Sequence, residues 1–300
     1  MWFKNLQIYR LPEGWNIQPE ALEEQLGRNR FQRCGNQDMQ SRGWTPPAGE
    51  ENLVHAQGSH FLISLGVEQK ILPAAVINQE AEERAEEISA QQGYPVGRKQ
   101  LKELKERVKE ELLPRAFRKR RRANVWIDAA GGWLVVDAAS GPKADEVLEV
   151  LGKTLDEFPI TRLHTEISPT AAMTDWLVSN EAPGGFTVDR DCELKSPAEE
   201  KATVRYVRHS LEGDEVRQHL VDGKVPTRLA LTWNDRVSFI LTEKLEVKRL
   251  AFLDIVKEEA ERQAENAAEQ FDADMALMTG ELSRFIPDLV QALGGETPRS

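Results

Sequence analysis

The residues most able to do chemistry are a run of cations near the middle of the 300-residue chain. Arg118 to Arg122 are five consecutive basic residues, and Phe117 comes directly before them. Guanidinium groups present planar, forked donors that suit phosphate, and the release of condensed counterions gives affinity for nucleic acid of any sequence. An exposed aromatic side chain beside them can stack on a base or wedge between base steps. The run therefore predicts sequence-independent binding of duplex or single-stranded nucleic acid.

The same region also has a purely structural interpretation. Lys102, Lys105 and Lys109 have the spacing of a solvated helix face whose lysines pair with neighbouring glutamates. Phe117 can equally be a buried anchor at the base of a helical hairpin. The two interpretations differ in the exposure of Phe117 and in the partners of the cations.

Charge is distributed unevenly along the chain. Residues 98–122 contain twelve basic and four acidic residues, a net charge of +8, whereas the whole chain carries −11. The remaining 275 residues therefore carry −19, and residues 254–300 hold eleven acidic residues against four basic ones. This pattern predicts a cationic tip on an anionic body and argues against a chain that coats nucleic acid over its whole surface.

A second, weaker group of cations lies in the C-terminal half of the chain. On a strand, Arg228 points away from the face that Leu229 and Leu231 share, so cations can gather on one face of a sheet. The alternative is ordinary sheet surface. The members of the group are Arg205, Arg208, His209, Lys224, Arg228, Lys248 and Arg249.

Signals for catalysis are weak, so we expect no enzymatic step, no cofactor and no metal. The sequence lacks the glycine-rich phosphate loops GxGxxG and GxxxxGK[ST] and the zinc motif HExxH. Asp272 and Asp274 are two residues apart on an expected helix and so face different directions. Cys34 and Cys192 lack the spacing of a disulfide framework or a zinc site. A nuclease assembled from distant carboxylates stays as an alternative.

The elements that must position the cations predict an α+β fold of mixed sheets with packed helices and a projecting helical hairpin. Helical spacing from Ala74 to Leu113, broken by Gly93, Pro95 and Gly97, predicts the hairpin. The other expected elements of the first half are a strand at 2–11, a helix at 19–26, a loop at 35–49, a strand at 61–67 and a β-hairpin formed by 124–128 and 133–138.

The sequence of the second half predicts further helices at 142–155 and 170–178, followed by a domain boundary at 183–185. Beyond it we expect five strands and one helix, and then a helical segment at 253–293 that is interrupted near Gly280 and Pro287. The strands are expected at 186–189, 203–208, 228–233, 237–241 and 245–252, and the helix at 214–221. The predicted domains are a central domain (1–72 and 123–182), a projecting tip (73–122) and a C-terminal base (183–300). The uncharged stretches are too short to span a membrane and the N-terminus lacks a signal-peptide pattern, which predicts a cytoplasmic protein.

Several segments, in order and over essentially the full chain, resemble the recombination-associated RdgC family of proteobacteria. They are WFKNLQIYRL (2–11), GWTPP (43–47), KILPAAVI (70–77), LLPRAF (112–117), LALTW (229–233) and FDADMALMTGEL (271–282). The resemblance implies a DNA-binding protein without sequence specificity. It also implies a ring-shaped homodimer, with duplex DNA passing through a cationic hole, that restrains the RecA recombinase by occupying its DNA and that associates with the nucleoid.

Carried onto this chain, the resemblance places Arg115 and Phe117 on the tip, and Arg208 and Lys224 near the hole. The chain departs from the family pattern at residues 93–97, where a lysine-rich turn is expected, and at Arg118 to Arg122, which is more basic than expected. The complete predicted DNA-binding set is Arg98, Lys99, Lys102, Arg115, Phe117, Arg118, Lys119, Arg120, Arg121, Arg122, Arg208, Lys224 and Arg228. The alternative function is an interaction protein that binds RecA or another partner directly through its acidic C-terminal region.

Overall fold

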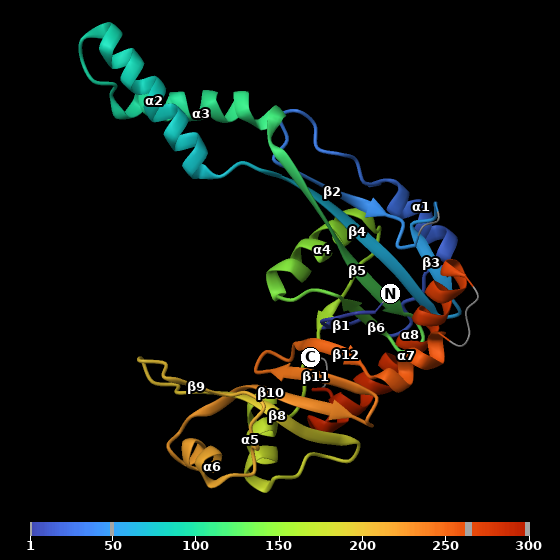
Figure 1. The fold of residues 1–300 in the computed structure, drawn as a ribbon. Coiled ribbons are helices and arrows are strands. Elements are labelled where there is room, and N and C mark those ends of the chain that lie inside the picture. Colours follow the sequence, from blue (N-terminus) through green and yellow to red (C-terminus); the bar gives the residue numbers. More distant parts are fainter. Residues whose placement is uncertain (1, 49–50, 262–265, 298–300) are drawn as a thin grey trace.

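The computed structural model describes residues 2–48, 51–261 and 266–297, and it confirms the mixed α+β fold (Figure 1). Two antiparallel sheets lie against each other through a shared core, and a helical hairpin projects from the larger sheet. The hairpin sets Arg98, Lys99 and Lys102 apart from the body.

The larger sheet has the strand order β2-β4-β5-β6-β1-β7, with β3 paired to β4. Helices α1 (Pro19–Gly27) and α4 (Gly141–Thr154) cover one face, where Leu22 and Val147 join the core of the sheet. The strands are β1 (Gln7–Arg10), β2 (Gln40–Thr45), β3 (Val54–Gln57), β4 (His60–Ile71), β5 (Phe117–Asp128), β6 (Trp133–Val136) and β7 (Thr161–Arg162). β4 and β5 are the longest and extend beyond the sheet toward the hairpin (Figure 1).

The smaller sheet has the order β12-β11-β10-β8-β9. Its buried face carries Leu229 and Leu231 and packs with helices α5 (Pro169–Ser179) and α8 (Ala267–Ala292) in one hydrophobic core. Trp126 of the larger sheet belongs to the same core, which joins the two sheets. The remaining elements are β8 (Phe186–Lys195), β9 (Thr203–Tyr206), α6 (Asp214–Val221), β10 (Val225–Trp233), β11 (Val237–Thr242), β12 (Val247–Phe252) and α7 (Asp254–Glu261).

The hairpin consists of α2 (Ala74–Gln92) and α3 (Arg98–Leu112) and has a small core of its own. Ala81, Leu104 and Val108 are buried between the two helices. Gly93 ends α2 in the left-handed region, at φ 80°, and donates its N–H to the Ser89 carbonyl, as a helix C-cap requires. A short 3-10 turn, η1 (Leu113–Arg115), then leads into β5.

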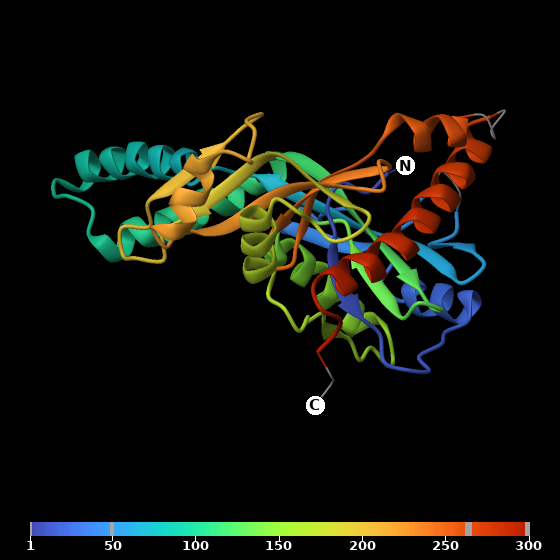
Figure 2. The ribbon, with the colours of Figure 1, turned by 90° about the horizontal axis from the view of Figure 1, so that it is seen from below.

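The subunit has the outline of a crescent. Figure 1 shows the hairpin at one end and β9 with α6 at the other, and both project to the same side. Figure 2, from a perpendicular direction, shows the same two projections on one side and α8 on the opposite side. The concave side of the crescent therefore lies between the hairpin and the β9 and α6 end of the smaller sheet.

Three sequence-based expectations about the elements differ from the structure. The predicted loop at 35–49 contains β2, which pairs with β4 from Gln40↔Gln69 to Thr45↔Ser64. Within β2, Gly43 allows the backbone of Phe31 to approach so closely that a Cβ at position 43 would lie 2.5 Å from the Phe31 Cα. The chain therefore needs glycine at this position.

The predicted interruptions near Gly280 and Pro287 are absent, because α8 continues from Ala267 to Ala292. Proline removes a helical hydrogen bond at a cost of about 3 kcal/mol. Phe285, Ile286 and Leu289 are buried around Pro287, and their packing offsets that cost.

The third difference concerns the predicted helical tip at 73–122. Its last six residues, 117–122, belong to β5 and pair with residues 66–71 of β4. Arg118 to Arg122 therefore lie on the part of the β4–β5 pair that leads to the hairpin, where β2 also pairs with β4 as far as Gln69. We call residues 66–71 and 117–122 together the neck.

Candidate nucleic-acid interface

The neck presents its cations on both faces because they lie in a β-strand, β5. Side chains alternate along a strand, so Arg118, Arg120 and Arg122 share one face and Lys119 and Arg121 the other. β4 supplies the opposing residues, from Ile71 beside Phe117 to Gly66 beside Arg122. The strand pairing therefore fixes which acidic groups the cations can reach.

On the first face, one buried carboxylate binds two arginines. Glu68 of β4 is 0% exposed and accepts hydrogen bonds from the Arg120 Nε at 2.5 Å and from the Cys34 N–H at 2.9 Å. The Arg118 Nη1 lies 3.8 Å from the same carboxylate. The hydrogen bond from Arg120 is the main cause of the lowered pKa of Glu68. Because one carboxylate serves two guanidinium groups, this cluster keeps a net positive charge.

Lys70 is the second buried charge on this face. Its Nζ donates to the carbonyl oxygens of Gly35 and Asn36 at 2.7 and 2.6 Å. Glu68 and Lys70 together hold the segment around residues 34–36 against the neck. Neither residue is in the predicted set, although their spacing of two places them on one face of a strand.

On the second face, Arg121 forms an ion pair with Glu146 of α4. Glu146 also binds the Arg42 Nε at 3.1 Å and the Gln40 side chain at 2.7 Å. Arg42 and Arg121 flank Val67 in the strand register and therefore lie on the same face. Ion pairs with Glu146 therefore hold this part of the neck to α4.

Two of the five cations in the run, Lys119 and Arg122, are not paired with a carboxylate of the described residues. Lys119 is exposed, as is Arg122, and neither forms an ion pair with any residue in the described part of the chain. Phe117, at the start of the run, is 85% exposed. The interpretation of Phe117 as a buried anchor is therefore wrong, and the neck carries an exposed aromatic ring on the same face as the free cation Lys119.

The hairpin carries the next group of predicted residues. Arg98, Lys99 and Lys102 on α3 are exposed, as is Arg115 in η1. Among the described residues, these four form no ion pair, and the expected pairing of lysines and glutamates along α3 is present only as a 3.5 Å contact between Lys109 and Glu106. The hairpin is instead braced by Arg84 of α2, whose hydrogen bond lowers the pKa of Glu111 on α3.

The third group lies on the smaller sheet. Arg228 is exposed on the face opposite Leu229 and Leu231, as the alternation predicts. Its Nε lies 3.9 Å from Glu193, which also binds the Arg205 Nε at 2.6 Å. Burial raises the pKa of Glu193, but hydrogen bonds from Thr227 and Arg205 and the nearby guanidinium charges produce a net lowering.

Arg208 and Lys224 flank this sheet near β9 and α6. The exposed Arg208 adopts a left-handed backbone conformation, with φ 54°, and its N–H donates to Asp191 at 2.8 Å. The Lys224 Nζ lies 3.1 Å from the Nδ1 of His219. Within a single subunit, the structure therefore places the predicted set in two regions, on the neck and hairpin and on the smaller sheet, rather than in one site. Both regions belong to the projecting ends of the crescent (Figures 1 and 2).

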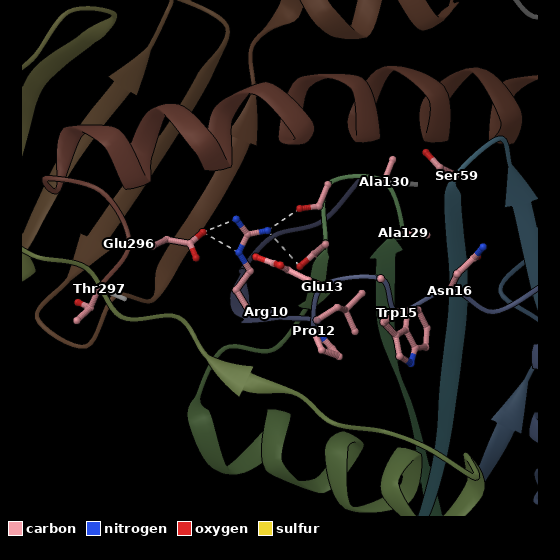
Figure 3. A pocket seen from close by; sticks show the side chains of 14 residues that line it. Arg10, Pro12, Glu13, Trp15, Asn16, Ser59, Ala129, Ala130, Glu296 and Thr297 are labelled. Atoms are coloured by element: carbon pink, nitrogen blue, oxygen red, sulfur yellow. Dashed lines mark hydrogen bonds and ion pairs between the residues drawn. The ribbon is translucent and has the colours of Figure 1, made fainter. Parts of the chain in front are cut away.

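None of the predicted residues lines the cavity of about 980 Å³ shown in Figure 3. Its central side chain, Arg10, binds Glu296 with its Nε at 2.6 Å and the Gly131 carbonyl with its Nη1 at 2.5 Å. The same guanidinium lies 3.5 Å from the centre of the Trp133 ring. Arg10 therefore joins β1, the β5–β6 turn and the C-terminal segment, and its role is structural.

The carboxylates considered for catalysis are also engaged in local contacts. Asp272 lies 3.1 Å from the Nε2 of His55, and Asp274 accepts a hydrogen bond from Gln270 at 2.8 Å. In residues 2–48, 51–261 and 266–297, no group of three or more His, Cys, Asp or Glu side chains is placed to hold a metal ion. Over the same ranges, no helix is long and apolar enough to cross a membrane.

Comparisons with known proteins identify the family. The family described as "Putative exonuclease, RdgC" matches residues 1–296. A recombination-associated protein RdgC from Dechloromonas aromatica (strain RCB) is 61% identical over 99% of this chain and 98% of its own length. Proteins of the same name from Herminiimonas arsenicoxydans and Janthinobacterium sp. (strain Marseille) are 55% and 54% identical, over 99% and 100% of both chains. The chain belongs to the RdgC family.

Proposed function

We propose that this protein binds DNA without sequence specificity, as a ring-shaped homodimer around the duplex, and acts in recombination. The observation that carries the proposal is the neck, where Phe117 is 85% exposed on the same face as the exposed Lys119, and where the exposed Arg122 lies on the opposite face. The relatives' name, recombination-associated protein, supports the choice of process. By occupying DNA, the ring limits the access of RecA, and the same activity accounts for a nucleoid location.

Phosphate binding in this proposal is divided among the cations of the neck. Lys119 and Arg122 contact phosphates directly, because no described carboxylate competes for them. Arg118, Arg120 and Arg121 share Glu68 and Glu146 and add a positive field around them. Phe117 stacks on or wedges between bases. Such contacts carry no base information, so every sequence binds about equally.

The crescent shape and the charge distribution support the proposed ring. Two crescents that meet at both projecting ends enclose a channel toward which the neck, hairpin and sheet cations are gathered. The −19 carried outside residues 98–122 repels duplex from the outer surface. The ring must open at one interface to admit closed DNA, and we assign this opening to the hairpins, with a buried area below the ~1,600 Å² of a standard stable contact.

Light scattering combined with fluorescence anisotropy tests this proposal. We expect the mass of a dimer and equal affinity for two duplexes of equal length and unrelated sequence. If a ring neutralises roughly six phosphates, the logarithm of affinity falls with the logarithm of salt concentration with a slope of about −5. A monomeric mass, a strong preference for one duplex or a flat salt response would overturn the proposal.

The same samples can be tested for nuclease activity, because the family description includes the word exonuclease. We propose that this chain holds DNA without cleaving it. End-labelled duplex incubated with the protein and magnesium should keep its full length. Magnesium-dependent shortening that is lost in Asp272→Asn or Asp274→Asn protein would instead support the nuclease alternative.

The alternative of direct partner binding through the acidic C-terminal region has less structural support. The Glu281 carboxylate binds Arg236, and Glu296 binds Arg10. Asp288 accepts a hydrogen bond from the Trp233 indole at 2.9 Å. These acidic groups hold the C-terminal helix to the body. Capture of RecA that persists after nuclease treatment would favour the alternative, whereas loss of capture would favour the DNA-mediated proposal.

A further inference from the structure

A second cationic surface lies away from the hairpin, where the N-terminal segment meets β12. The Leu250 N–H donates to the Lys4 carbonyl at 2.9 Å, and Leu6 and Val247 exchange hydrogen bonds at 2.8 and 3.1 Å. Figure 2 shows the N-terminus at this end of the smaller sheet, far from α2 and α3. The N-terminal segment therefore runs antiparallel along the edge of β12.

Beside this junction is a groove of about 570 Å³ with an apolar floor. The buried Phe252 forms part of the floor and stacks against Trp2, with the ring centres 4.7 Å apart. The exposed Ala251 of β12 also lines the groove. This arrangement provides room for a large apolar side chain beside β12.

Three cations surround the groove, and no carboxylate is among the described residues that line it. Lys4, Arg249 and Lys257 are exposed, and in the described ranges none of the three forms an ion pair with a side chain. Arg249 has a left-handed backbone conformation, with φ 50°, at an irregularity in the pairing of β11 and β12. The protein has a net charge of −11, so this groove, with three unpaired cations and no carboxylate among its described lining residues, selects for an anionic ligand.

The N-terminal wall of the groove is fixed before any partner arrives. The carboxylate of Asp137 accepts the N–H groups of Lys4 at 3.2 Å and Asn5 at 2.9 Å. A rigid wall lowers the entropy cost of binding. The groove is therefore a preformed surface.

We propose that this groove binds an acidic peptide segment of a partner protein, with a large apolar side chain of the peptide on the Trp2 and Phe252 floor. The acidic residues of the peptide face Lys4, Arg249 and Lys257, whose charges are opposite to theirs. Nucleic acid, whose bases can stack on aromatic rings, is the competing ligand, and the test below distinguishes the two.

The test uses a short labelled peptide in which aspartate and phenylalanine alternate, with fluorescence anisotropy as the readout. We expect binding to the intact protein and an affinity about tenfold weaker or worse for the triple variant Lys4→Glu, Arg249→Glu, Lys257→Glu. The matched control is Arg98→Glu, Lys99→Glu, Lys102→Glu, which makes the same change of net charge on the hairpin and should bind the peptide normally. Ala251→Trp, which fills the groove without changing charge, should also abolish binding.

Several outcomes would overturn the proposal, given that thermal melting shows the variants are folded. They are no binding to the intact protein, equal binding by the groove and hairpin variants, and unchanged affinity for a peptide whose phenylalanines are replaced by serine. Displacement of the peptide by a short single-stranded oligonucleotide would reassign the groove to nucleic acid. A drop in solution mass confined to the groove variant would reassign it to a second copy of the chain. DNA binding is measured separately on the same samples, so failure here does not affect the proposed function.

Discussion

The unequal pairing of the five neck cations gives a quantitative prediction for the double variant Lys119→Ala, Arg122→Ala. Neither side chain forms an ion pair in the described part of the chain, so both are free to replace counterions on DNA. Each phosphate contact contributes about 0.9 to the slope of log affinity against log salt. Losing two contacts per subunit removes about 1.8 from the slope, and about 3.6 if both subunits of a dimer engage the duplex.

The matched control is Arg118→Ala, Arg121→Ala, which removes the same formal charge from the same strand. These guanidinium groups share Glu68 and Glu146, and both carboxylates keep a second arginine partner, Arg120 or Arg42. Because paired cations release fewer counterions on binding, the control should change the slope by less than half as much.

Anisotropy titrations over an about fourfold range of salt resolve this difference, since each lost contact changes the salt response about 3.5-fold over that range. Thermal melting checks that both variants are folded. Equal slope changes in the two double variants would refute the reasoning from ion pairing. An unchanged slope in the Lys119 and Arg122 variant would show that the neck is not part of the DNA interface.

Three further predictions follow from single residues. Phe117→Ala should weaken DNA binding about five- to hundredfold, from ~1–3 kcal/mol per stacked base, and should leave the melting temperature unchanged because the ring is 85% exposed. For Glu68, the hydrogen bond from Arg120 lowers the pKa, so the carboxylate stabilises the fold above its ordinary value of 4.5 and loses this effect as pH falls through the lowered pKa. Urea unfolding of Glu68→Gln should therefore show its full stability deficit near neutral pH and a shrinking one below pH 4.5; a constant deficit would contradict this pKa argument. Gly43→Ala should lower the unfolding free energy by about 1–3 kcal/mol by forcing a Cβ against the Phe31 backbone, which calorimetry measures, and an unchanged value would contradict that contact.

Local signals predicted several elements correctly. Gly131 and Gly132 mark the turn between β5 and β6, and Gly132 has a positive φ of 68°, which glycine readily adopts. α6 begins and ends at the predicted residues, Asp214 and Val221, because two acidic residues open it and Gly223 follows it. The helical hairpin was predicted from its spacing and its Gly-Pro-Gly turn. In each case, the information lies within a few residues along the chain.

The elements that sequence reasoning missed depend on distant partners. β2 contains Gln40, Ser41 and Arg42, which give no alternating apolar pattern, and its pairing with β4 makes it a strand. Arg118 to Arg122 likewise give no periodic signal, and β4 fixes both their conformation and their two faces. The predicted site residues were named one by one, but their ion pairs with Glu68 and Glu146 depend on strand register and on the position of α4. Register of this kind is set by tertiary packing.

Closure of a ring around DNA is the central claim, and cross-linking of the hairpins tests it most directly. Tyr94 is 63% exposed in the turn between α2 and α3, so Tyr94→Cys places a reactive thiol at the tip. The native Cys34 and Cys192 are buried, and burial raises the pKa of Cys192 to about 12, so neither competes for the cross-linker. A dimer bridged through position 94 should still bind linear duplex with free ends and should lose binding to covalently closed circular duplex. Equal binding of the linear and circular forms by the bridged dimer would contradict the account.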